Sequence, residues 1–368
     1  MTKPVKKVLV LRFSAMGDVA MTAAALREFA SAHPDIHFTM VSRPLFAPFF
    51  EGADNLAFFP SDFKNKYKGL PGLWRLFHEL RRQKPDAVAD LHDVLRTKII
   101  RILFRLWGFK VKKINKGRAE KRRLTRRRHK QLTPLKHMIE RYTETLAAAA
   151  NYELRITNYE LEGSNQVSGI KHQVSGIEKQ EMLKQVQHDE TNNSQFSILN
   201  SQFKLAVAPF AKYKGKIYPP ERMEKIVAHF AQMEHVEVYL FGGGAEEISL
   251  LAEWAAKYKG VISLAGKMSL SEELAQLATM NVVVSMDSAN MHLASLVGVP
   301  VVSIWGATHP FAGFTGWKQP EGNNIQIDLP CRPCSVFGNK PCYRHDYACM
   351  DISEKIIIEK ITKFTYSF

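Results

Sequence analysis

The chain has 368 residues, of which 45% are hydrophobic and 10% aromatic, and its formal net charge is +15. This length fits two domains of about 150 residues each, and the composition is that of a globular protein, which excludes a disordered chain. The apolar run after Lys6 and Lys7 is too short for a signal peptide. No stretch approaches the roughly 20 apolar residues of a membrane span. We therefore expect a cytoplasmic protein.

Residues 1–155 are predicted to form an N-terminal α/β domain. Buried strands are predicted at 8–11, 38–41 and 87–91, and helices at 19–31, 72–83, 95–107 and 135–150. This alternation is typical of a parallel, doubly wound sheet.

The stretch 156–203 differs from the rest of the chain in composition. It is rich in Gln, Asn and Ser, and it contains paired near-duplications such as QVSGIKHQVSGI and NSQFSILNSQF. Their periods are too short for a solenoid. We interpret this stretch as a low-complexity linker or insertion without catalytic content.

The α/β pattern resumes over 204–351, the predicted C-terminal domain. Strands are predicted at 204–210, 236–244, 261–266, 282–287 and 300–306, and helices at 220–232, 246–258, 271–280 and 288–298. Two such domains place a ligand site in the cleft between them, at the carboxyl ends of the strands. A last helix, 352–368, is expected to pack back on the first domain.

Asp18 stands where the first strand gives way to a helix, in the stretch RFSAMGDVAMT. An Asp at this place often caps the helix. It is also where a ligand would lie at the edge of the sheet. The residues alone leave both interpretations open.

The stretch 282–310, VVVSMDSANMHLASLVGVPVVSIWGATHP, has the pattern of an anion site. A strand ends at Asp287, and Ser288 is a good N-cap for a helix whose N–H groups and dipole suit a diphosphate. His292 lies about one turn inside that helix. The alternative is an ordinary capped helix with His292 in the core, but a second small-residue turn, WGATHP, at the same sheet edge favours a site.

Basic and glycine-rich turns follow other strands of this half. Lys212, Lys214 and Lys216 come just before a helix that opens with proline, where a lysine either reaches a phosphate or is merely solvated. FGGGAEE offers Glu246 for ribose hydroxyls, although it lacks G-x-G-x-x-G spacing. The chain has no D-x-D motif, so lysine and a helix dipole would have to neutralise a leaving diphosphate.

Four cysteines follow with the spacing C-x2-C-x7-C-x6-C: Cys331, Cys334, Cys342 and Cys349. The first pair has zinc-ligand spacing. The second pair is irregular, so reduced cysteines that pack a loop are the alternative to a structural zinc site. A disulfide framework is not expected without an export signal.

The positive charge is concentrated between Arg96 and Lys130, where 16 Lys and Arg stand against Glu120 alone. This excess equals the net charge of the whole chain, so one segment would meet an anionic partner. A solvated face is the plain alternative. Nucleic-acid binding is another, although the segment lacks interleaved aromatic residues and a known binding module.

The ordered set of motifs resembles the lipopolysaccharide heptosyltransferases, glycosyltransferase family nine, over 5–150 and 205–352. The motifs are RFSAMGDVAMTAAAL, DLHDVLRTK, NKGRAEKRRL, KGKIYPPERMEKI, LFGGGAEE, LAGKMSLSEELAQL, MDSANMHLASLVGVPVVSIWGATHP and the cysteine stretch. The resemblance implies a GT-B fold, with two doubly wound, Rossmann-like domains facing each other across a cleft. It also implies inverting, metal-independent transfer of heptose from ADP-heptose to a lipopolysaccharide core acceptor. Another nucleotide-sugar donor or surface-glycan acceptor is the alternative.

The resemblance further implies roles for single residues. Asp18 matches the aspartate of S-x-M-G-D, the candidate general base, and Lys216 matches a lysine that contacts the donor phosphates. The residues matched to the donor side are Asp287, Ser288, Ala289 (where the family pattern has Gly), His292, Glu246, Met268, Thr308 and His309. Those expected on the acceptor side are Arg12, His92, Arg96, Lys116 and Arg118. Because Kdo carboxylates, lipid A phosphates and the inner-membrane surface are anionic, the basic segment is expected to orient the acceptor or touch that surface.

Overall fold

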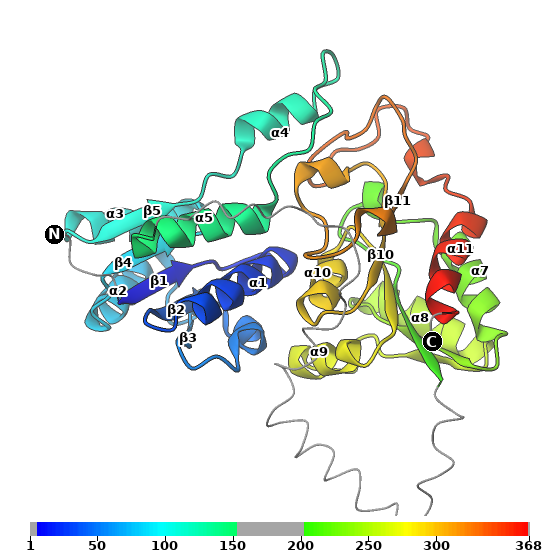
Figure 1. The fold of residues 1–368 in the computed structure, drawn as a ribbon, viewed down its shortest axis with the longest axis horizontal. Coiled ribbons are helices and arrows are strands. Elements are labelled where there is room, and N and C mark those ends of the chain that lie inside the picture. Colours follow the sequence, from blue (N-terminus) through cyan, green and yellow to red (C-terminus); the bar gives the residue numbers. More distant parts are fainter. Residues whose placement is uncertain (1–5, 153–201, 367–368) are drawn as a thin grey trace, which may run out of the picture.

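The computed structural model describes residues 6–152 and 202–366. Apart from its last two residues, the predicted linker therefore lies outside the described residues. The chain folds into two α/β halves that lie side by side (Figure 1), each built on a sheet in which every strand pair is parallel.

The N-terminal half contains a five-stranded sheet in the order β3-β2-β1-β4-β5. Its strands are β1 (Lys7–Leu11), β2 (His37–Ser42), β3 (Leu56–Pro60), β4 (Ala87–Asp90) and β5 (Lys110–Lys113). Its helices are α1 (Met16–Ala32), α2 (Gly69–Arg82), α3 (Leu95–Leu106), α4 (Arg118–Leu124) and α5 (Met138–Ala150), with a short 3-10 helix at Pro44–Phe50. Alternate β1 residues face opposite sides, because Val8 and Val10 pack toward α1 and α5 whereas Leu9 and Leu11 pack toward α2 and α3.

The C-terminal half contains a six-stranded sheet in the order β11-β10-β9-β6-β7-β8. Its strands are β6 (Phe203–Ala208), β7 (Val236–Leu240), β8 (Val261–Ser263), β9 (Val282–Met286), β10 (Val301–Trp305) and β11 (Asn324–Gln326). Its helices are α7 (Pro220–Ala231), α8 (Ala245–Lys257), α9 (Leu270–Ala278), α10 (Ala289–Leu296) and α11 (Glu354–Thr365). Short 3-10 turns occur at Lys214–Lys216, Pro310–Ala312, Glu321–Asn323 and Ala348–Met350.

The predicted fold class, two doubly wound parallel sheets, is confirmed. The strands that the sequence did not predict, β3, β5 and β11, all lie at sheet edges. Edge strands tolerate charge and proline and need little hydrophobic pattern: β5 reads KVKK and β3 ends in Pro60. The short helix α4, inside the basic segment, was not predicted either.

The position predicted for the last helix is wrong. Helix α11 lies against α7 and β9 of the C-terminal half and not on the first domain, as its place beside α7 in Figure 1 shows. Ile357 and Ile361, one turn apart, are both fully buried in the second core. Arg222 of α7 also pairs with Glu354 at 2.7 Å. Helix α11 therefore makes both its apolar and its ionic contacts with its own half.

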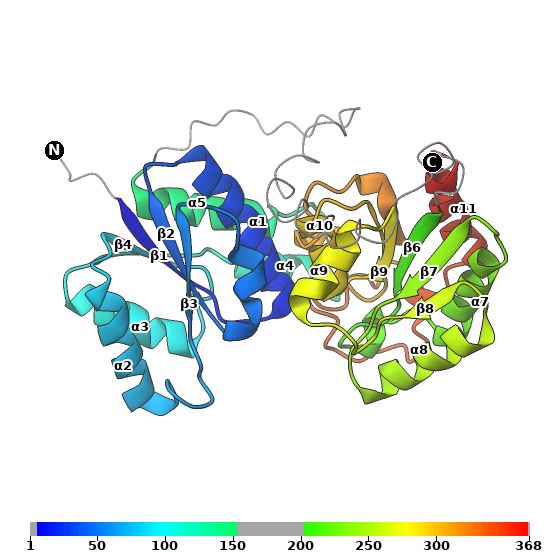
Figure 2. The ribbon, with the colours of Figure 1, turned by 90° about the horizontal axis from the view of Figure 1, so that it is seen from below.

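The two halves meet mainly through α1 and α10, which Figure 2 shows lying next to each other. One apolar cluster runs from the first sheet through α1 to buried residues of α10, such as Met291 and Leu293. In each sheet, strand order reverses beside one central pair, β1 with β4 and β6 with β9. Such reversals open a crevice at the carboxyl ends of the strands, and all the predicted turns follow these strands or their neighbours.

Candidate active site

Asp18 lies in the first turn of α1, which begins at Met16 after Ala15 as N-cap. Its carboxylate makes no capping bond. Instead Oδ1 lies 2.9 Å from the guanidinium of Arg12, and the Asp18 side chain is 28% exposed. Arg12 is itself held by the Leu91 carbonyl and the Tyr142 hydroxyl, to which it donates at 2.6 and 2.9 Å. The capping interpretation therefore does not describe Asp18, whose carboxylate is fixed in orientation by a buried cation while remaining partly exposed.

His292 of α10 lies against the same turn of α1. A Cβ placed on Gly17 would be 2.8 Å from His292 Cδ2 and 3.4 Å from Ala289 Cα, so only glycine permits this approach of the two helices. Burial lowers the pKa of His292 to about 4, although Asp287 and Asp18 both act in the opposite direction. Its Nδ1 is buried and has no hydrogen-bond partner among the described residues. His292 is thus a neutral imidazole on which the charges of both candidate carboxylates act.

Lys216 and Asp287 form an ion pair at 2.9 Å, with both side chains largely buried. Asp287 directly follows β9 and precedes Ser288, the N-cap of α10, and Lys216 closes the 3-10 turn after β6. The pair therefore places the ammonium group beside the N-terminus of α10, whose free N–H groups carry partial positive charge.

The start of α10 differs in one respect from the predicted cap. Ser288 occupies the N-cap position, but its side chain accepts no bond from the helix; its hydroxyl lies 3.1 Å from that of Ser285. The first N–H groups of α10 are therefore not occupied by this side chain. Ala289 is the first residue of the helix and is partly buried against Gly17.

The turn after β10 supports the Lys216 loop. Ala307 donates its N–H to the Gly215 carbonyl at 2.8 Å. A Cβ on Gly338 would lie 2.5 Å from the Lys216 side chain.

Thr308 is fully buried and its hydroxyl has no partner within the described ranges. Burial lowers the pKa of His309, the next residue, to about 4.

Arg332 fixes this turn, and the sequence interpretation missed it. The buried guanidinium donates to the carbonyls of Thr308 and Trp305 at 2.9 and 3.1 Å, and further to Gly306, Ile327 and Gln326. No local sequence pattern indicates this role of Arg332, because its partners lie up to 27 residues away along the chain.

On the opposite side, His92 and Lys116 gather around Arg12 and Asp18. His92 Nδ1 accepts from the Phe13 N–H at 3.3 Å, and burial with the nearby Arg12 and Lys116 charges lowers the His92 pKa to about 3. Burial, then Arg12 and Arg118, lower the pKa of Lys116. Of the five expected acceptor residues, Arg12 pairs directly with Asp18, and the charges of Arg12 and Asp18 both act on His92 and Lys116.

Arg118 and Arg96 lie farther out. Arg118 pairs with Asp93 at 3.0 Å while its side chain is 58% exposed. Arg96 is exposed and lies over the Phe63 ring at 5.2 Å. Arg101, which the sequence interpretation did not single out, is buried and pairs with both Asp90 and Asp93, so it fixes the turn that carries His92.

Two predicted donor residues are less engaged. Glu246 is exposed at the start of α8, and it is the next residue, Glu247, that accepts from the Gly243 N–H at 2.8 Å. Met268 is partly buried against the apolar cluster that spans the two halves. Among the described residues, no hydrogen bond or ion pair joins Glu246 or Met268 to the Lys216–Asp287 pair.

The four cysteines are free thiols. Cys334 lies near the Cys331 carbonyl at 3.5 Å, and Cys342 near Asp346 at 3.7 Å. Over residues 6–152 and 202–366, no three His, Cys, Asp or Glu side chains are arranged to hold a metal ion. A structural zinc site and reduced cysteines that pack a loop both stay predictions.

Comparisons with known proteins agree on the family. The sequence profile of glycosyltransferase family 9 (heptosyltransferase) matches residues 73–341. The lipopolysaccharide core heptosyltransferase OpsX of Haemophilus influenzae is 23% identical over 84% of this chain and 81% of its own length. Lipooligosaccharide heptosyltransferase 2 of Campylobacter jejuni is 26% identical over 44% of this chain. The match spans about half (51%) of that relative's length.

Solved structures share the fold. A glycosyl transferase family 9 protein from Veillonella parvula superposes with a TM-score of 0.69 at 18% identity, covering 100% of this chain and 99% of that one. The E. coli heptosyltransferase WaaC with ADP gives 0.62 at 19% identity, covering 97% and 99%. Among the described residues, no helix has the length and apolar character needed to cross a bilayer. The chain belongs to glycosyltransferase family 9, the heptosyltransferases.

Proposed function

We propose that this enzyme transfers heptose from ADP-heptose to a lipopolysaccharide core acceptor, with inversion at the anomeric carbon. The observation that carries the proposal is the meeting of Asp18, from one half, with His292 and the Lys216–Asp287 pair, from the other. The choice of donor is supported by the E. coli WaaC structures with ADP and with ADP-2-deoxy-2-fluoro heptose. The choice of acceptor is supported by the core heptosyltransferase from Haemophilus influenzae.

The donor diphosphate would lie at the N-terminus of α10. Free N–H groups there and the Lys216 ammonium supply positive charge in a partly enclosed place, where it acts on the charge that develops on the leaving group. Asp287 keeps the flexible lysine side chain in position. The buried Thr308 hydroxyl and His292 Nδ1, which have no partner among the described residues, would bond the donor.

Asp18 would act as the general base. An acceptor hydroxyl is a weak nucleophile, so its proton must pass to a carboxylate as its oxygen attacks the anomeric carbon. The new glycosidic bond forms as the bond from the anomeric carbon to the diphosphate oxygen breaks, and the electron pair leaves with ADP. Attack opposite the leaving group inverts the configuration in one step.

The acceptor would approach past the cationic groups around Asp18. Arg12 and Lys116 supply the charge nearest to Asp18, with the neutral His92 imidazole beside them, and the exposed Arg118 and Arg96 lie farther out. The acceptor and the inner-membrane surface are both anionic, so the basic segment would bring the enzyme to the cytoplasmic face of that membrane. Another nucleotide-sugar donor with the same diphosphate would use the same groups.

A thermal-shift panel of nucleotide sugars, followed by a transfer assay, tests the proposal. ADP-heptose is expected to raise Tm more than UDP-, GDP- or dTDP-sugars, and its heptose is expected to appear on the core acceptor with inverted configuration. A larger shift and faster transfer with a different nucleotide sugar would reject ADP-heptose as the donor. Stabilisation by ADP-heptose without transfer to the core would reject the acceptor.

A further inference from the structure

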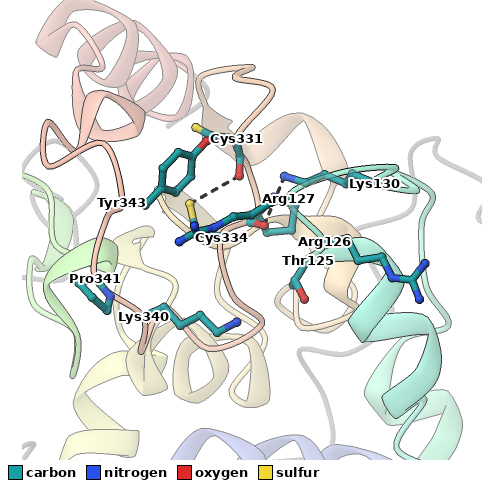
Figure 3. A pocket seen from close by; sticks show the side chains of 10 residues that line it. Thr125, Arg126, Arg127, Lys130, Cys331, Cys334, Lys340, Pro341 and Tyr343 are labelled. Atoms are coloured by element: carbon teal, nitrogen blue, oxygen red, sulfur yellow. Dashed lines mark hydrogen bonds between the residues drawn. The ribbon is translucent and has the colours of Figure 1, made fainter.

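A small pocket lies between the end of α4 and the cysteine-containing loop of the other half. Its volume is about 80 Å³, enough for several water molecules. Residues 125–130 form one wall, and residues 331–343 contribute the other, as Figure 3 shows. The pocket is therefore assembled only where the two halves meet, and it is separate from the Asp18 and Lys216 groups described above.

The side chains that line this pocket carry positive charge and no negative charge. Four are cationic, Arg126, Arg127, Lys130 and Lys340, and no Asp or Glu is among the lining residues. Within the described parts of the chain, no carboxylate forms a salt bridge with any of these four. The nearby Asp346 is already paired with Arg344 at 2.9 Å. Unbalanced like charges repel in so small a space, and an anion would relieve that repulsion.

Two of the cations make contacts that restrict their positions. The Lys130 ammonium donates to the carbonyls of Arg332 and Pro330 at 2.7 and 3.1 Å, across the boundary between the halves. Burial lowers the pKa of Lys130, because the charged ammonium loses part of its hydration beneath the loop. Arg127 lies over the Tyr343 ring, 4.6 Å from its centroid. Fixed cations lose less entropy when they bind a ligand.

The loop that forms the second wall also supports the candidate donor groups. Arg332 donates to the Thr308 carbonyl at 2.9 Å, and Gly338 packs on the Lys216 side chain. An anion in the pocket would thus bind the same loop that supports Lys216. This position suits a group carried by the acceptor at some distance from its reacting hydroxyl.

We propose that this pocket binds a phosphate group of the acceptor glycolipid. The inference rests on the proposed function for the acceptor, and it assigns Arg126, Arg127, Lys130 and Lys340 as the phosphate-binding residues. Arginine matches phosphate with paired N–H donors, and lysine adds a point charge. A pocket of this size takes one phosphate group, whereas attraction to a membrane surface needs only an open basic face. The same chemistry would recognise a phospholipid headgroup, which the experiment separates.

Two double variants of the full-length enzyme test the assignment. R126Q/R127Q removes two lining guanidinium groups, and R122Q/R123Q removes two exposed arginines of the same basic segment that do not line the pocket. Binding of inorganic phosphate is measured by calorimetry. The acceptor KM is measured with intact and with phosphatase-treated glycolipid. Co-sedimentation is measured with vesicles of phosphatidylcholine and phosphatidylglycerol.

The proposal expects R126Q/R127Q to weaken phosphate binding and raise the KM for intact acceptor, each at least about tenfold, with kcat unchanged. With dephosphorylated acceptor, the KM of this variant should equal that of the unsubstituted enzyme. R122Q/R123Q should match the unsubstituted enzyme in phosphate affinity and in the KM for intact acceptor. Equal losses in both variants, or no loss in either, would overturn the site. Loss of vesicle binding alone would overturn the assignment to the acceptor in favour of a lipid headgroup. Phosphate binding is measured without donor or acceptor, so failure of the transfer reaction itself leaves this test intact.

Discussion

Gly17 of α1 and His292 of α10 touch across the boundary between the two halves, so closely that a single added carbon on Gly17 would lie 2.8 Å from the imidazole. The contact joins the half that carries Asp18 to the half that carries Lys216 and Asp287. Its geometry therefore sets the separation between the proposed base and the proposed donor site.

Gly17→Ala is expected to lower transfer about 10- to 100-fold, because displacing reacting groups by about an ångström has effects of that order. Steric overlap should also cost about 1–3 kcal/mol of stability. Gly322→Ala is the matched control, since a Cβ there meets nothing within 4 Å. Steady-state kinetics and urea unfolding measure both effects, and a Gly17→Ala enzyme with full activity would show that the contact does not set the geometry.

Asp18→Asn is expected to lower kcat about 10²- to 10⁴-fold, the usual contribution of a general base. The variant keeps the shape of the side chain, and Arg12 keeps its bonds to Leu91 and Tyr142, so the loss of stability should stay within about 1–3 kcal/mol. Calorimetry with ADP should give an unchanged affinity. Turnover close to that of the unsubstituted enzyme would remove Asp18 from the role of base.

Lys216→Met is expected to weaken ADP binding about 10- to 100-fold, because a hydrogen bond to a charged group contributes roughly 1.5–3 kcal/mol. The variant also leaves Asp287 without its cation next to the diphosphate. Lys212→Met serves as the control, since Lys212 is an exposed lysine of the same loop. Equal ADP affinities for the two variants would contradict the role of Lys216.

Stability is expected to fall as the pH drops from about 7 to about 5, partly because of His292. In the unfolded chain this imidazole has its ordinary pKa of 6.5, whereas burial lowers the folded value to about 4. Between these values the unfolded state binds the extra proton, so each unit of pH costs up to about 1.4 kcal/mol. His292→Gln should therefore show a shallower slope in urea unfolding over this range. Parallel slopes for the unsubstituted protein and His292→Gln would refute the assignment.

EDTA is expected to leave transfer unchanged, because the proposed charge stabilisation comes from Lys216 and the α10 N-terminus. Initial rates with and without the chelator measure this, and metal analysis of the purified protein accompanies them. A rate that falls with EDTA and returns with added Mg²⁺ or Mn²⁺ would place a divalent ion in the reaction. A fall that only zinc reverses would point to the cysteine loop.

The sequence carried enough information to predict the central strands and the turns after them, because buried parallel strands have continuous apolar runs that end abruptly at polar residues. The resemblance of the ordered motifs to the family implied roles for Asp18, Lys216, Asp287 and His292, and those roles stay predictions. The sequence could not predict that Asp18 pairs with Arg12 instead of capping α1, since both geometries suit an Asp at that position. Edge strands such as β5 and the long-range partners of Arg332 left no local pattern. The apolar face of α11 could pack against either half, and the sequence alone does not show which half provides the matching surface.

The side-by-side packing of α1 and α10 has an electrostatic consequence. Gly17 and Ala289 lie close together, so the N-terminal turns of two helices, each with partial positive charge, are neighbours. Asp18 and Asp287 offset this charge only in part, because each already neutralises a basic side chain. A nucleotide diphosphate would act as a shared counterion for both helix ends and draw the halves together. The protein should therefore be most compact when a multiply charged ligand is bound. The compaction that the ligand causes should become smaller as added salt screens the helix ends.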